Sequence, residues 1–146
     1  MKVGRRVALA VLLVVGACSR PGREAILTKD APAPIGPYAQ AVRAGNMLYV
    51  SGQLGVDPTT GALAEGGVVP QAHQALKNLG AILAAAGYSY DDVVQVQVFL
   101  DDMKDFALVN GAYRSYFTKT LPARAAVEVR RLPMDAKVEV LAVAMH

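Results

Sequence analysis

The sequence predicts an α+β fold in which a mixed β-sheet carries two helices on one face. The chain has 146 residues and no internal repeat, which suits a single domain with its own core. Apolar residues alternate with a period of two in several stretches and recur at helical spacing in two others. These patterns run along the chain as strands, a helix, a strand, a second helix and two further strands. That order is typical of α+β proteins.

Turn-forming residues separate the strands expected in the first part of the chain. Residues 26–28 are expected to form a short edge strand, and residues 39–44 and 47–51 a hairpin around Gly45-Asn46. The proline-rich stretch between them is a loop with little backbone freedom that ends at Tyr38. A fixed loop that delivers a tyrosine could form a site wall, or the ring could simply pack on its own strand.

Two helices and one strand follow the hairpin. Pro70 suits the first turn of a helix that Gly87 ends. The stretch 93–100 is expected to be a strand with Val94, Val96, Val98 and Leu100 on one face and Gln95, Gln97 and Phe99 on the other. A second helix should start near Asp102, with Asn110 beside its apolar stripe. That amide could belong to a site or be satisfied by backbone or water.

Two charged residues near the C-terminus are candidates for chemistry. Arg124 follows Pro122 at the start of an extended run, where a guanidinium could bind a planar carboxylate with two parallel hydrogen bonds or lie free on the surface. Glu139 shares the face of Leu141 and Val143 in the last strand, residues 137–145, so this carboxylate needs a partner or a function. We expect a hairpin through residues 133–136 to place these two strands side by side. Arg124 and Glu139 could then form a structural ion pair, or bind a substrate carboxylate and handle a water.

The first residues look like an export signal. A basic start is followed by the apolar run 7–17, which is too short to span a membrane. The tetrapeptide Val15-Gly16-Ala17-Cys18 resembles a bacterial lipobox, in which the signal is cut before a cysteine that becomes lipidated. We therefore expect a signal peptide at 1–17, lipidation at Cys18, a tether at 18–24 and a folded domain at 25–146. The alternatives are a cytosolic protein with an apolar extension, or a twin-arginine signal at Arg5-Arg6.

Charge and composition exclude several classes of site. The whole chain has 15 Lys and Arg against 12 Asp and Glu, and Lys2, Arg5 and Arg6 lie in the predicted signal. The remaining chain therefore balances at 15 − 3 = 12 basic against 12 acidic residues, which gives no reason to expect nucleic-acid binding. Cys18 is the only cysteine, and His73 and His146 are far apart in sequence, so neither a thiol nucleophile nor a metal site is expected in the domain.

Several short motifs together resemble the Rid family of reactive-intermediate deaminases, over about residues 25–145. They are Ile35-Gly36-Pro37-Tyr38, Ser51-Gly52-Gln53, Val109-Asn110, Pro122-Ala123-Arg124 with Val127-Glu128-Val129, and Lys137-Val138-Glu139-Val140. The resemblance implies a chorismate-mutase-like fold and a homotrimer with clefts between subunits. It also implies cofactor-independent hydrolysis of 2-imino acids, such as 2-iminopropanoate and 2-iminobutanoate, to 2-keto acids and ammonia.

The same resemblance assigns roles to individual residues. Arg124 would bind the substrate carboxylate and Glu139 would orient or activate the attacking water. The pocket would be lined by Tyr38, Ser51, Gly52 and Asn110. Ala126 departs from the family pattern, because many members have a cysteine two residues after the arginine.

Export is a second departure, since family members are mostly cytosolic or organellar. The expected location is the cell envelope, on the periplasmic side. The outer membrane is favoured because Ser19 is not the aspartate associated with inner-membrane retention. Two other functions stay open: a non-catalytic protein that binds small carboxylates at the envelope, and, ranked lower, the ribonuclease activity of older family names. The sequence identifies no source of imine outside the cytoplasm.

Overall fold

The protein is built on one six-stranded mixed sheet. The computed structural model describes residues 22–146. Its strands are β1 (Arg23–Ile26), β2 (Ala41–Ala44), β3 (Met47–Leu54), β4 (Val93–Leu100), β5 (Ala123–Glu128) and β6 (Val138–Met145). Their order across the sheet is β1-β2-β3-β6-β4-β5, and all neighbours are antiparallel except the parallel pair β4 and β5. The predicted mixed sheet is confirmed.

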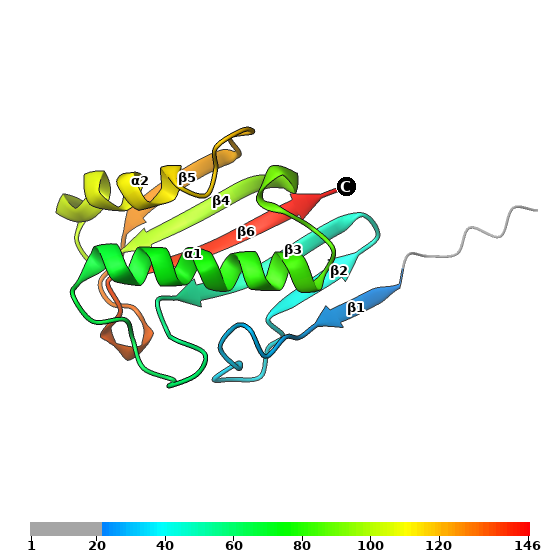
Figure 1. Cartoon of the computed structure of the whole chain (residues 1–146), viewed down its shortest axis with the longest axis horizontal. Coiled ribbons are helices and arrows are strands. Elements are labelled where there is room, and N and C mark those ends of the chain that lie inside the picture. Colours follow the sequence, from blue (N-terminus) through cyan, green and yellow to red (C-terminus); the bar gives the residue numbers. More distant parts are fainter. Residues whose placement is uncertain (1–21) are drawn as a thin grey trace, which may run out of the picture.

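Both helices cover the same face of the sheet, as Figure 1 shows. The long helix α1 (Val68–Ala85) lies over β3 and β6, and the shorter α2 (Phe106–Arg114) packs beside α1. Short 3₁₀ turns occupy Tyr90–Asp92, Met103–Asp105 and Pro133–Asp135. After α1, Gly87 takes the left-handed conformation with φ 80°, as expected for a glycine that ends a helix. The predicted layer of two helices on one face is confirmed.

The core lies between α1 and the middle of the sheet. Leu76, Leu79 and Leu83 recur at helical spacing and are at most 1% exposed. Val140 and Ala142 of β6 are equally buried among them. Removing each leucine side chain from water stabilises the fold by about 1.5–3 kcal/mol. This packing makes α1 and β6 the centre of the fold, and Glu139 projects from β6.

The predicted hairpin between the strands of Arg124 and Glu139 is wrong. β6 pairs with β3 and β4, so β4 separates it from β5. The physical reason is burial. Alternate residues of β6 are fully buried, which suits the middle of the sheet, whereas most residues of β5 are exposed, which suits an edge. Residues 129–137 therefore lead from the edge strand β5 past the end of β4 to the centre.

Several element boundaries differ from the predicted ones. β1 ends at Ile26, so the edge strand lies earlier than residues 26–28 and takes in the last residues of the predicted tether 18–24. Val94 is 40% exposed instead of sharing the buried face, because the register between β4 and β6 shifts between Val93 and Gln95. Asp102 caps the 3₁₀ turn before α2, accepting a hydrogen bond from the backbone N–H of Lys104 at 2.9 Å.

The predicted signal peptide at residues 1–17, the lipidation site Cys18 and most of the tether lie outside the described residues. Between residues 22 and 146, no helix combines the length and the apolar character that a membrane crossing requires.

Candidate active site

Gly52 and Glu139 meet at a bulge in β3. The register between β3 and β6 shifts between Val50 and Gln53, so Gly52 has no directly paired residue in β6. The Glu139 carboxylate lies against this gap. A Cβ atom on Gly52 would overlap Oε1 of Glu139 and lie 2.7 Å from its Cδ. Glycine is therefore required here by the close approach of the carboxylate.

Glu139 is half-buried and has no charged partner. Its side chain forms no salt bridge or hydrogen bond with the described part of the chain, and it shares its face of β6 with Leu141 and Val143. Burial raises the pKa of this carboxyl above its ordinary value. A carboxylate with free lone pairs and a raised pKa is suited to accept a proton from water.

A cavity of about 290 Å³ adjoins Gly52. Its walls come from the loop before β2, the loop after β3 and the turn before β6, and they include Tyr38, Gln40, Leu54 and Met134. Buried Gln40 holds the first loop in place. Its Oε1 accepts from the backbone N–H of Thr28 at 2.6 Å, and its Nε2 donates to carbonyls of residues 28, 31 and 32. These hydrogen bonds hold the proline-rich loop as one wall of the cavity.

Tyr38 stands in that wall with its ring 48% exposed. Its hydroxyl accepts a hydrogen bond from the backbone N–H of Ile35 at 3.2 Å, and its own backbone N–H donates to the carbonyl of Gly36 at 2.9 Å. The ring therefore lines the cavity instead of packing into the core. The hydroxyl still has a proton to donate to a ligand.

Ser51 does not line this cavity, although it lies next to Gly52 in the bulge. Its hydroxyl donates to the carbonyl of Ala39 at 2.7 Å, and its backbone N–H donates to the carbonyl of Gln40 at 3.0 Å. Both bonds tie β3 to the end of the proline-rich loop. The described chain thus uses the Ser51 hydroxyl proton to position the loop that carries Tyr38.

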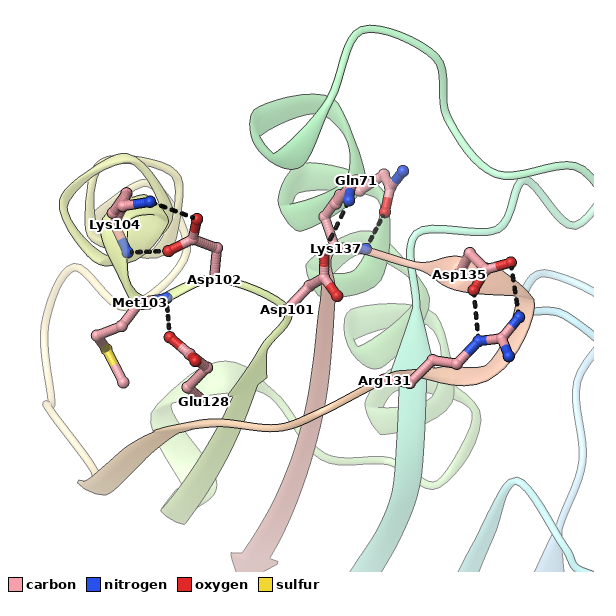
Figure 2. A network of polar contacts seen from close by, with 9 residues as sticks. All are labelled: Gln71, Asp101, Asp102, Met103, Lys104, Glu128, Arg131, Asp135 and Lys137. Carbon is pink, nitrogen blue, oxygen red and sulfur yellow. Dashed lines mark hydrogen bonds and ion pairs between the residues drawn. The ribbon is translucent and has the colours of Figure 1, made fainter.

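A charged network holds the turn behind the cavity, and Figure 2 shows its members. Met134 and Asp135 have positive φ values of 59° and 56°, a backbone conformation that residues other than glycine rarely adopt. The Asp135 carboxylate accepts from Nε and Nη2 of Arg131 at 2.6 and 3.2 Å. Lys137 pairs with Asp101 through Nζ at 2.7 Å. These contacts fix both Met134 in the cavity wall and the start of β6.

Arg124 lies at a second cavity, of about 260 Å³, lined also by Asn110, Tyr113, Arg114, Leu121 and Pro122. Pro122 stands just before β5, so it removes no donor from the sheet, as expected. Nη2 of Arg124 donates to Oδ1 of Asn110 in α2 at 2.7 Å. The structure thus brings two of the candidate site residues, Arg124 and Asn110, into direct contact.

The Arg124 guanidinium is open to an anion. It is exposed, and no carboxylate within residues 22–146 forms a salt bridge with it. Asn110 occupies one of its five N–H donors. The remaining donors can hold a planar carboxylate through two parallel hydrogen bonds. Arg124 is therefore a ready carboxylate-binding group.

The two halves of the predicted site do not meet in one chain. Arg124 pairs across the sheet with buried Val96, which places its side chain on the helix-covered face. Glu139 pairs with Phe99, the strand neighbour of buried Val98 and Leu100, and so lies on the open face. Of the two alternatives for Arg124 and Glu139, the ion pair is therefore absent within one chain. Side chains on opposite faces of one sheet cannot act on the same substrate.

No group of three or more His, Cys, Asp or Glu side chains in the described part of the chain could hold a metal ion.

Comparison with known proteins identifies the family. A family model described as endoribonuclease L-PSP matches residues 28–146. The chain belongs to this family. The mouse 2-iminobutanoate/2-iminopropanoate deaminase is 53% identical over 124 residues, which cover 85% of this chain and 92% of the mouse protein. A RutC family protein of Pyrococcus horikoshii is 52% identical over 122 residues, covering 84% and 97%.

Solved structures of similar proteins share the fold. The crystal structure of the Escherichia coli YjgF gene product superposes with a TM-score of 0.81 at 48% identity, covering 84% of this chain and 98% of that one. That of E. coli TdcF with bound serine gives a TM-score of 0.81 at 42% identity, with the same coverage. The resemblance to the Rid family and the predicted chorismate-mutase-like fold are confirmed.

Within this family fold, three site residues escaped the sequence analysis. They are Tyr113, Gln40 and Met134, to which the sequence motifs assign no role in a site. Helical spacing could have revealed Tyr113, because it lies three residues after Asn110 on the same face. No local pattern marks Gln40 or Met134, whose roles depend on loops that the fold brings together.

Proposed function

We propose that the protein hydrolyses 2-imino acids, such as 2-iminopropanoate and 2-iminobutanoate, to 2-keto acids and ammonia. The observation that carries this proposal is the Arg124 guanidinium, exposed in a cavity with one amide partner and no carboxylate partner in the described chain. Relatives with the name 2-iminobutanoate/2-iminopropanoate deaminase, about half identical to this chain, support it.

Arg124 recognises the substrate carboxylate. Two guanidinium N–H groups bind the two carboxylate oxygens, and this bidentate contact fixes the plane in which the adjacent imine carbon lies. Asn110 holds the guanidinium from the other side. Orientation of this kind matters here because a protonated imine carbon is already electrophilic and mainly needs an aligned water.

Glu139 transfers a proton from the attacking water to the imine nitrogen. Its carboxylate accepts a proton from a water while the water oxygen forms a bond to the imine carbon, giving a tetrahedral amino alcohol. Glu139 then returns this proton to the nitrogen. The C–N bond breaks with its electron pair going to nitrogen, and the hydroxyl proton passes to the leaving ammonia as the oxygen becomes the keto group. One water enters for each ammonia released. The burial that raises the Glu139 pKa makes its carboxylate a stronger base for the first of these transfers.

The catalytic site needs two copies of the chain. Arg124 and Glu139 lie on opposite faces of one sheet, so a single copy cannot present both to one substrate. The open face also carries apolar side chains, including Tyr49, 50% exposed, and Met145, 45% exposed. Burial of this face in a homotrimer would cover it and bring Arg124 of one copy beside Glu139 of another.

The test measures keto-acid release. The purified protein is added to 2-iminopropanoate generated in situ, and pyruvate is followed with and without protein. We expect acceleration by the wild type and a loss of at least about 100-fold in kcat/KM for Arg124→Ala, since a charged hydrogen bond and substrate orientation are both removed. Arg130→Ala is the matched control, because Arg130 is exposed and lies six residues away. No acceleration by correctly assembled wild type would rule out this activity.

A second proposal concerns location. We propose that the chain is exported and anchored to the cell envelope through lipid on Cys18, facing the periplasm. The basic start, the apolar run and the cysteine support it. The alignments cover 92–97% of the length of these relatives but 84–85% of this chain. This difference is consistent with an added segment outside the shared domain.

Fractionation of bacteria that express the full chain tests this location. With labelled fatty acid, we expect the label in the wild-type protein and in the membrane fraction, and no label in Cys18→Ser. A soluble, unlabelled wild-type protein in the cytoplasm would contradict the anchor, while the deaminase assay would be unaffected.

A further inference from the structure

The Arg124 guanidinium packs against one face of helix α2. Three of its residues, Phe106, Asn110 and Tyr113, follow one another at intervals of four and three and so share one helix face. The Cζ atom of Arg124 lies 4.5 Å from the ring centroid of Tyr113 and 5.7 Å from that of Phe106. Asn110 accepts the hydrogen bond between them. The charge thus has an amide and two aromatic faces as its neighbours.

The Tyr113 ring is rigid. It is only 6% exposed, and it stacks on Phe117 with ring centroids 4.3 Å apart and planes at 22°. Phe117 in turn meets the edge of Tyr90 at 5.3 Å and 83°. Phe106 differs, because its side chain is 40% exposed. A ring anchored in the core can fix the position of a cation far better than a ring on the surface.

The Tyr113 hydroxyl takes no part in this contact. Its oxygen is buried and has no hydrogen-bond partner in the described chain. Burial raises the pKa of Tyr113 to about 12, and the nearby charge of Arg124 only partly opposes this. The phenol is therefore neutral, and it is the negative face of the ring that attracts the cation.

This geometry keeps the guanidinium edge free. Arg124 has no carboxylate partner among residues 22–146, so an internal ion pair does not hold it. An aromatic face attracts the cation without occupying its N–H groups, whereas a carboxylate would occupy the donors that a substrate needs. The contact holds the side chain and leaves its hydrogen-bonding capacity for the ligand.

We propose that Tyr113 is a positioning residue that orders the Arg124 guanidinium for carboxylate binding through its ring face, independently of its hydroxyl. The effect on catalysis rests on the deaminase function proposed above. A preordered arginine loses less conformational entropy when the substrate binds, so the contribution belongs to KM.

Two substitutions separate the ring from the hydroxyl. Tyr113→Leu removes the aromatic face, and we expect KM for 2-iminopropanoate to rise about 2- to 30-fold with kcat within about twofold of the wild type. Tyr113→Phe keeps the ring and should retain the wild-type KM. Phe106→Leu is the matched control and should raise KM less than Tyr113→Leu. The proposal is overturned if a folded Tyr113→Leu protein keeps the wild-type KM, or if Tyr113→Phe is as impaired as Tyr113→Leu.

An NMR measurement tests the contact without any turnover. A side-chain N–H proton of Arg124, assigned by its absence from the Arg124→Lys spectrum, should be shifted upfield by the ring current of Tyr113. The shift should persist in Tyr113→Phe and disappear in Tyr113→Leu. A resonance at the position of a free arginine in the wild type would overturn the proposal, even if Tyr113→Leu did not fold. A shifted resonance in a protein without deaminase activity would leave the positioning role standing and reject the proposed reaction.

Discussion

At the scale of single residues, two charges that the fold leaves unpaired lie at the second cavity and at the bulge of β3. Arg131 is paired with Asp135, and Lys137 with Asp101. Arg124 and Glu139 have no such partner within the described chain. Arg124 lies over the ring of Tyr113 and Glu139 lies against Gly52, and neither neighbour forms a hydrogen bond with the charged group. An exposed ion pair contributes little to stability, so an unpaired, half-buried charge such as Glu139 is the stronger sign of function.

We expect the reaction to depend on the ionised form of Glu139. The wild-type kcat should fall as the solution becomes acidic, with the midpoint above 4.5, the ordinary value for a glutamate, because burial raises this pKa. Glu139→Gln should lose about 100-fold or more in kcat and show no acidic limb, since an amide cannot accept the proton. The kcat–pH profiles of the two proteins check this. An identical acidic limb in both would assign the titration to another group.

The same group should affect stability in the opposite direction. A raised pKa means that the native state holds the Glu139 proton more tightly than the unfolded state does, so ionisation destabilises the fold as pH rises. This cost is absent well below pH 4.5 and complete above the raised native pKa. Glu139→Gln should therefore be more stable than the wild type near neutral pH, with the difference shrinking on acidification. Urea unfolding of the wild type and of Glu139→Gln, at fixed protein concentration and at neutral and acidic pH, measures this difference in the free energy of unfolding.

At the scale of elements, α1 and α2 differ in how tightly their glycines are packed. A Cβ on Gly80 of α1 would overlap the hydroxyl of Tyr90 and lie 2.9 Å from its Cζ. That hydroxyl donates to the carbonyl of Leu76 at 2.6 Å and ties the turn before β4 to α1. A Cβ on Gly111 of α2 would meet nothing within 4 Å. Gly80 thus serves a close contact, whereas Gly111 does not.

Alanine at these two positions should have effects of opposite sign. Gly80→Ala should lower the free energy of unfolding by about 1–3 kcal/mol, because the methyl group displaces Tyr90. Gly111→Ala should raise it by about 0.5–1 kcal/mol, because alanine restricts the unfolded chain and fits the helix without strain. Urea unfolding midpoints compare them directly. Equal effects at both sites would show that helix propensity, and not the Tyr90 contact, decides the outcome at Gly80.

At the scale of the whole molecule, the split site and the open apolar face lead to the same expectation. The helices cover one face of the sheet and leave the other bare (Figure 1). The bare face carries the Glu139 half of the site and the exposed ring of Tyr49, while the Arg124 half lies beside α2. Assembly through the bare face would complete the catalytic site and remove apolar surface from water in one step.

Complementation tests whether two copies share one site. Arg124→Ala and Glu139→Gln should each be nearly inactive alone. When they are co-expressed and assort at random, roughly a quarter of the interfaces should combine an intact Arg124 with an intact Glu139. We therefore expect about a quarter of the wild-type activity from the mixture, and none from the two proteins mixed after separate assembly without subunit exchange. No recovery in verified mixed oligomers would mean that each site lies within one chain.

The sequence by itself determined both helices and most of the strands, and it named the candidate site residues. Alternation in residues 95–100 and helical spacing around Leu76 and Leu79 are local signals, because the direction of each side chain repeats with the period of its own strand or helix. Only the tertiary structure decided that β6 lies between β3 and β4, and that Arg124 and Glu139 point to opposite faces. Strand order depends on which faces pack together across the whole core, and no short stretch of sequence contains that information.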